Sequence, residues 1–181
     1  YQHSLWLAHQ MDPRSPAYNL ASAFRVSSSL DIAKLQHAFD QVVSRHRLLH
    51  STFRHEHGVV RQIEQPLPAS TVEVLEVAGG EGMATAIAQA RMPFDLETGP
   101  LTRMILIREN ENGEKILLLV LHHILADERS LAALWRELSE AYGGGHLRDR
   151  ARVQYDDYVH WFEGRDPRQR DRARPLPRPR T

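Results

Sequence analysis

An unbroken apolar run from Ile116 to Leu121 constrains the fold of this chain more than any other feature. Six consecutive apolar residues, rich in leucine, follow the turn signal Asn112-Gly113. A strand with one exposed face alternates apolar and polar residues, whereas a strand covered on both faces does not need to. The run therefore predicts a central strand that is buried on both faces.

Two histidines and a carboxylate follow this strand directly, as His122, His123 and Asp127. Side chains alternate across a strand, so His122 and His123 are expected to point to opposite faces. This geometry argues against a metal ion held by both imidazoles and favours a division of roles, with one ring in the core and the other facing a cleft. A lone histidine after such a strand is typical of a packed core side chain. The added presence of Asp127, just before an expected helix, favours a functional role.

Further elements follow from the periodicity of apolar residues and from turn signals. The Asn-Gly turn predicts a hairpin between two of the strands. The alternation of strands and helices without a strict βαβ rhythm predicts an α/β fold, a two-layer sandwich with a mixed β-sheet. We expect strands over 18–28, 51–55, 59–65, 71–77, 101–108 and 114–121, and helices over 1–10, 31–46, 81–92, 127–142 and 153–162.

Composition excludes several classes of function. The 181 residues have a formal net charge of zero and include no cysteine. We therefore expect no nucleic-acid partner, no disulfide and no thiolate site, and no apolar stretch reaches the roughly 18 residues of a membrane span. His55 and His57 would share a strand face, but no third ligand accompanies them, so no metal site is expected. The chain begins at Tyr1 without a signal-peptide pattern, which favours a cytoplasmic segment cut from a longer protein.

The composition changes abruptly after Gly164. Arginine and proline dominate residues 164–181 and apolar residues nearly vanish. Such a segment cannot bury a core. We expect a folded unit over residues 1–163 and a disordered, solvated tail, in preference to a nucleic-acid-binding or partner-binding arm.

Five motifs, in a fixed order, resemble those of nonribosomal peptide synthetase condensation domains and the related chloramphenicol-acetyltransferase-like acyltransferases. Residues 122–127 are similar to the HHxxxDG signature, and residues 45–53 to the RHxxLRTxF motif. The other matches are the opening motif at 4–6 with the PxSPAYN segment at 13–19, the PFDLxxGPLxR segment at 93–103, and residues 154–158 followed by Trp161. The resemblance covers about residues 1–163.

The resemblance implies a chloramphenicol-acetyltransferase-like single lobe, the N-terminal lobe of a condensation domain. Such a domain forms an amide between a carrier-bound acyl or peptidyl thioester and a carrier-bound aminoacyl amine. By position in the motif, His123 would be the catalytic histidine, acting as a general base or as a hydrogen-bond partner that positions the amine. His122 would be the inward, structural histidine, and Asp127 would hold the catalytic loop, paired with an arginine. Arg45 and His50, from the second motif, would have supporting roles.

Three departures from the family pattern stand out. His50 replaces the arginine of the second motif, with Ser51 beside it in place of threonine. Glu128 replaces the glycine that follows the signature aspartate. It would either crowd the substrate tunnel or point to solvent at a helix N-terminus, and we favour the second arrangement. The second lobe of the family fold is absent from this sequence.

Two hypotheses follow. In the first, the chain is the N-terminal lobe of a condensation-type acyltransferase and is inactive without its partner lobe. It would bind no cofactor itself, because its substrates arrive on the phosphopantetheine arms of carrier proteins. In the second, it is a degenerate, non-catalytic lobe that binds carrier proteins or neighbouring synthetase domains. A stand-alone ester-forming or amide-forming relative is a more remote alternative that would also use His123.

Overall fold

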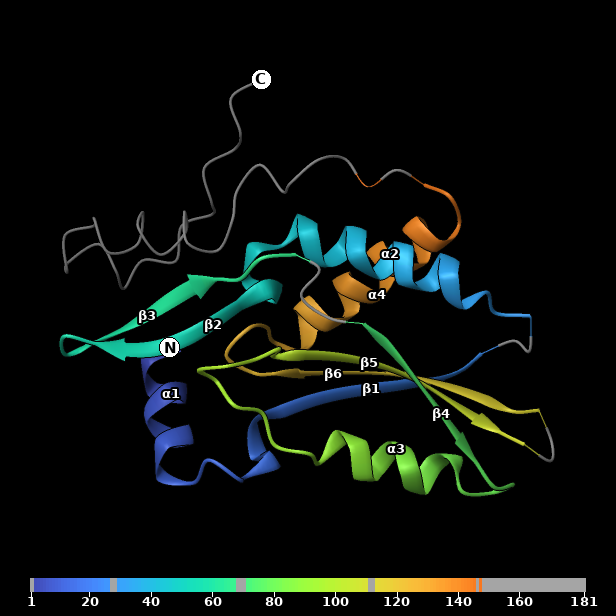
Figure 1. The fold of residues 1–181 in the computed structure, drawn as a ribbon, viewed down its shortest axis with the longest axis horizontal. Coiled ribbons are helices and arrows are strands. Elements are labelled where there is room, and N and C mark those ends of the chain that lie inside the picture. The colour runs from blue at the N-terminus through green and yellow to red at the C-terminus, as the bar shows by residue number, and fades with distance from the viewer. Residues whose placement is uncertain (1, 27–28, 68–70, 111–112, 146, 148–181) are drawn as a thin grey trace.

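A four-stranded mixed sheet forms the centre of the molecule (Figure 1). The computed structural model describes residues 2–26, 29–67, 71–110, 113–145 and 147. The strands lie in the order β1 (Asn19–Val26), β6 (Lys115–His122), β5 (Thr102–Glu109) and β4 (Val72–Val77). The β1–β6 and β6–β5 pairs are antiparallel and the β5–β4 pair is parallel, which confirms the predicted α/β class with a mixed sheet.

The apolar run forms the central strand, as the sequence predicts. All residues of β6 after Lys115 are buried, and β1 and β5 flank it on its two sides. Leu121 lies opposite Leu20 of β1 and Thr102 of β5. The strand therefore delivers His122 and His123 to the end of the sheet from a position that neighbouring strands fix on both sides.

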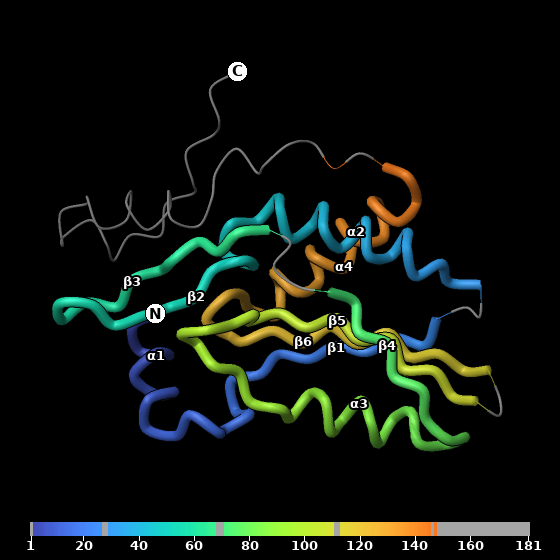
Figure 2. Tube along the Cα trace, viewed as in Figure 1, coloured from blue at the N-terminus to red at the C-terminus, as the bar shows by residue number. Residues whose placement is uncertain are grey.

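Two helices cover one face of the sheet, and a third lies against the other face (Figures 1 and 2). Helices α2 (Ile32–Arg45) and α4 (Glu128–Tyr142) pack together over the sheet. Both have an amphipathic pattern, with the buried stripes Leu35, Phe39, Val42 and Val43 in α2 and Leu131, Leu134 and Leu138 in α4. Helix α3 (Gly82–Ala90) packs on β5 and β6 from the opposite side, so it adds a cover to the two layers that the sequence predicts.

Both ends of α3 are fixed by side chains from other elements. At its N-terminus, the buried carboxylate of Glu109 accepts hydrogen bonds from the backbone N–H groups of Gly80 and Gly82, at 2.9 and 2.8 Å. This satisfies N–H groups that a helix start leaves without intrahelical partners. At its C-terminus, Nδ2 of Asn19 donates to the carbonyl oxygens of Ala90 and Met92, at 2.8 and 2.9 Å.

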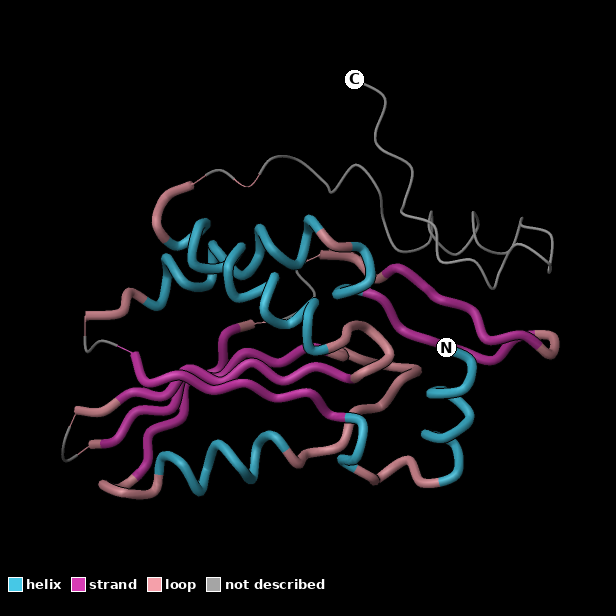
Figure 3. The backbone as a smooth tube through the Cα atoms, turned by 180° about the vertical axis from the view of Figure 1, so that it is seen from behind, coloured by secondary structure: helices cyan, strands magenta, loops and turns pink. Residues whose placement is uncertain are grey.

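A separate two-stranded hairpin, β2 (Ser51–Glu56) and β3 (Val59–Glu64), lies beside helix α1 (Gln2–Met11). Figure 3 shows α1 and this hairpin from behind, at the end of the molecule away from the start of α3. The indole of Trp6 stacks on the imidazole of His55, with ring centroids 5.3 Å apart. Two short 3-10 turns, Pro16–Tyr18 and Arg47–His50, lead into β1 and β2.

The helix expected over 153–162 and the tail expected over 164–181 lie outside the described residues. Within the described ranges, no helix has the length and apolar character needed to cross a membrane.

Candidate functional site

The end of β6 turns sharply into helix α4 and is held by backbone hydrogen bonds on both sides. His122 N–H donates to the carbonyl of Leu101, at 3.1 Å, and His123 N–H donates to the carbonyl of Tyr18, at 2.7 Å. Leu125 N–H closes the turn onto the carbonyl of His122, at 2.9 Å. The two histidines are therefore positioned by the sheet itself.

His122 is buried and neutral. Its Nδ1 accepts a hydrogen bond from Ile124 N–H, at 3.1 Å, so the ring proton resides on Nε2. Among the described residues Nε2 has no hydrogen-bond partner. Burial, reinforced by His9 and then His123, lowers the pKa of His122 to about 4. A ring in this state supports the turn and is not available as a base near pH 7.

His123 is half-buried and has the opposite tautomer. Its Nδ1 lies 2.7 Å from the carbonyl oxygen of Ala126. A carbonyl oxygen only accepts, so Nδ1 is the donor, and in the neutral ring Nε2 has the lone pair. This tautomer is the one in which Nε2 can accept a proton.

Asp127 is exposed and caps helix α4. Its Oδ1 accepts from the backbone N–H of Ser130, at 2.8 Å, and from the Ser130 hydroxyl, at 2.7 Å. These hydrogen bonds, that from the hydroxyl first, lower the pKa of Asp127. The partner of the carboxylate is thus a serine of the same helix. Glu128 is exposed in the first turn of α4, which agrees with the expectation that it points to solvent at a helix N-terminus.

Arg45 and His50 contact other parts of the fold. Nε of Arg45 lies 3.4 Å from a carboxylate oxygen of Glu137 on α4, and Nε2 of His46 lies 2.6 Å from the other oxygen. His50 is buried, with Nδ1 3.0 Å from the carbonyl oxygen of Gln65. These contacts join α2 to α4 and hold the end of β3, so both residues have structural partners at a distance in sequence from His123.

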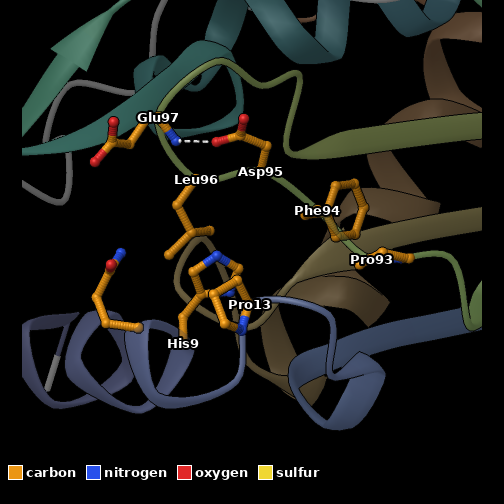
Figure 4. Close-up of a pocket in the computed structure, with 8 residues that line it drawn as sticks. His9, Pro13, Pro93, Phe94, Asp95, Leu96 and Glu97 are labelled. Atoms are coloured by element: carbon orange, nitrogen blue, oxygen red, sulfur yellow. Dashed lines mark hydrogen bonds between the residues drawn. The ribbon is translucent and has the colours of Figure 1, made fainter.

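Sequence reasoning missed His9, a buried histidine of α1. Its ring lies edge-on to that of His122, with centroids 5.6 Å apart, and Phe94 packs against the same ring of His122. His9 also lines a pocket between α1 and residues 93–97 (Figure 4). The available signal was spacing, since His9 follows Leu5 by four residues and Trp6 by three, and so lies on the buried face of the helix.

The part of the chain that the structure describes contains no group of three or more histidine, aspartate or glutamate side chains placed to hold a metal ion. His57 does not share a strand face with His55, which corrects the prediction. It lies after β2, in the hairpin turn, with a φ of 52°.

The mixed sheet, its helices and the paired histidines at the end of a buried central strand define a chloramphenicol-acetyltransferase-like lobe. The family model Condensation domain matches residues 1–173, and the chain belongs to this family.

Similar proteins support this membership. Chondramide synthase cmdD of Chondromyces crocatus is 34% identical over 178 residues, which are 92% of this chain and 4% of that protein. The probable non-canonical nonribosomal peptide synthetase CymA of Salinispora arenicola is 36% identical over 165 residues, 88% of this chain and 2% of that protein. Among solved structures, the complex of the X-domain and OxyB from teicoplanin biosynthesis matches with a TM-score of 0.79 and 26% identity, over 90% of this chain and 36% of that one. The chain thus spans a small part of each relative.

Proposed function

We propose that this chain is the N-terminal lobe of a nonribosomal peptide synthetase condensation domain and supplies His123 as its catalytic residue. The reaction joins a carrier-bound acyl or peptidyl thioester to the amine of a carrier-bound aminoacyl group. The observation that carries the proposal is the contact between His123 Nδ1 and the Ala126 carbonyl, at 2.7 Å. It holds the ring in the tautomer whose Nε2 has the lone pair.

Amide formation requires the amine to lose a proton as it attacks the thioester carbonyl. The new C–N bond forms, the C–S bond breaks, and the sulfur leaves as a thiol once it gains a proton. A neutral imidazole in this tautomer would accept or orient the amine proton. The thioester and the amine would arrive on phosphopantetheine arms of two carrier domains, so this chain needs only to position His123 between them.

Residues around His123 fix its loop. His122 holds Ile124 N–H from the buried side, and Asp127 fixes the start of α4 through Ser130. The loop from 123 to 127 is therefore anchored at both ends, so the imidazole is oriented before substrate binds.

The test is single-turnover condensation by the complete protein that contains both lobes, with loaded donor and acceptor carriers and mass-spectrometric detection of the product. His123→Ala should lower the rate by about 100-fold or more, the contribution typical of a positioned acid or base. His57→Ala, which changes a histidine in the β2–β3 turn, is the matched control and should leave the rate unchanged. A near-normal rate for His123→Ala would refute the proposal.

A second candidate function is non-catalytic docking of carrier proteins or neighbouring synthetase domains. The similarity to an X-domain that is found in complex with OxyB favours it, as do the departures at His50 and Glu128. If the chain only docks partners, no matched pair of donor and acceptor should give product with the unaltered protein, and carriers should still bind to the His123→Ala variant. Turnover that depends on His123 would exclude this candidate.

A further inference from the structure

A pocket of about 410 Å³ lies between the C-terminal end of α1 and the loop that follows α3. Its lining combines apolar and polar side chains. The apolar side chains are those of Pro13, Pro93, Phe94 and Leu96, and the polar ones are those of His9, Gln10, Asp95 and Glu97.

His9 is the polar group most deeply placed in this pocket, with only 6% of the residue exposed. Figure 4 shows its ring rising from α1 beside Pro13, toward the loop that contains Leu96. Within the described residues, no hydrogen bond joins either ring nitrogen of His9 to another group, and neither nitrogen is among the fully buried polar atoms that lack a partner. Burial lowers the pKa of His9, against the opposing effect of Asp95 and Asp12, so near pH 7 the ring is neutral and has one nitrogen able to accept.

The charged groups of the pocket are both carboxylates. Asp95 uses Oδ1 to accept from the backbone N–H groups of Glu97 and Thr98, at 2.8 and 3.3 Å, and remains exposed. The Glu97 side chain is exposed as well. No lysine or arginine is part of the lining of this described pocket.

Two arginines approach the loop from outside the pocket. The guanidinium of Arg103 lies over the ring of Phe94, 4.0 Å from its centroid, and donates to the carbonyl of Met92. Nε of Arg54 donates to the backbone carbonyl of Glu97, at 3.3 Å. Both contact the loop through groups other than its two carboxylates.

We propose that this pocket binds a protonated primary amine at the end of a short aliphatic chain. The aliphatic part would lie on the apolar side chains, the ammonium would donate to a ring nitrogen of His9, and Asp95 and Glu97 would balance its charge.

Direct binding of small probes to this chain tests the pocket without any turnover. The probes are n-pentylammonium chloride and 1-pentanol, which share the alkyl chain and differ in charge, and the readout is the NMR shift of the His9 ring carbons and protons. Pentylammonium should shift these signals with saturation, and 1-pentanol should bind more weakly. Glu97→Gln should weaken pentylammonium binding by about threefold, the effect of one exposed charge.

Glu81→Gln is the matched control, because it removes the same charge at the opposite end of α3 and should leave the affinity unchanged. Raising sodium chloride from about 20 to about 200 mM should weaken pentylammonium binding and leave 1-pentanol binding unaltered. Equal affinity for the two probes, no shift at His9, or no effect of Glu97→Gln would each overturn the proposal. Loss of condensation activity in the complete protein, with probe binding intact, would instead count against the proposed function alone.

Discussion

The imidazole of His9 on α1 lies edge-on to the imidazole of His122 at the end of β6, with an interplanar angle of 89°. Burial lowers the pKa of each ring, and the neighbouring His9 lowers the pKa of His122 further. The contact ties the first helix of the chain to the strand that positions His123. It also makes the core beside the candidate site sensitive to acid.

Stability should fall as the pH is lowered from about 6.5 to about 4, and His122 should account for much of the fall. The pKa of His122 is lowered to about 4 in the folded chain, so the unfolded chain binds the proton first. The neutral ring is therefore stabilising above pH 6.5, and that contribution, about 3 kcal/mol at most, is lost toward pH 4. Urea unfolding followed by circular dichroism at several pH values would measure how the free energy of unfolding changes with pH. His122→Phe should make this change smaller, and a change equal to that of the unaltered chain would contradict the role given to His122.

Replacing His123 should leave the fold intact. The ring is half-buried and its contact with the Ala126 carbonyl lies within one turn. His123→Ala is expected to lower the free energy of unfolding by about 1 kcal/mol or less, the net value of one such hydrogen bond. Chemical denaturation of the two chains gives the difference. A loss of several kcal/mol would show that His123 is chiefly structural.

Asp127 should contribute to stability as a helix cap. Asp127→Ala removes the acceptor of Ser130 N–H and should cost about 1 kcal/mol of unfolding free energy. Asp127→Asn keeps an acceptor oxygen and should cost clearly less. Thermal unfolding of both variants at one pH separates the effect of losing the capping oxygen from the effect of losing the charge. Equal losses would indicate that the charge, and not the cap, is what matters.

The start of α3 should not tolerate a side chain at Gly82. A Cβ there would overlap Oε1 of Glu109 and would lie 3.1 Å from Cδ1 of Ile116. Gly82→Ala would displace the buried carboxylate from two backbone N–H groups, with a cost of about 1–3 kcal/mol. Gly80→Ala is the contrasting variant, since its Cβ would meet no atom within 4 Å and its cost would come from its φ of 81°. Urea midpoints of both variants measure the effects. A Gly82→Ala chain as stable as the parent would show that the carboxylate moves aside freely.

Much of the fold was predictable because its signals are local. The apolar run at 116–121 and the helical stripes each determine an element from neighbouring residues, and the structure contains these elements, with β5 and β6 paired antiparallel as the hairpin prediction requires. The order and direction of the strands in the sheet were harder to predict from the sequence. The parallel pairing of β4 with β5 joins two strands that α3 separates along the chain, and periodicity does not report which strand pairs with which.

Only the part of the candidate site formed by residues adjacent in the sequence was predictable. Residues 122–127 are contiguous, so their motif places them together. The packing of His9 and Phe94 on His122 joins segments about 113 and 28 residues away in sequence, and no spacing rule predicts such contacts. Likewise, the resemblance implied an arginine as the partner of Asp127, whereas the side chain is exposed and Ser130 supplies its hydrogen bonds.

Hydrogen bonds to Glu109 at the N-terminal end of α3 and from Asn19 at its C-terminal end fix both ends of the helix. The loop over residues 93–97 follows the C-terminal end of α3 that Asn19 fixes. Its position relative to the sheet is therefore determined when the chain folds. The entropy of ordering this wall is lost in folding and need not be lost again when a ligand enters. Removal of the Asn19 hydrogen bonds should therefore make the entropy of ligand binding less favourable, while the contacts in the pocket stay unchanged.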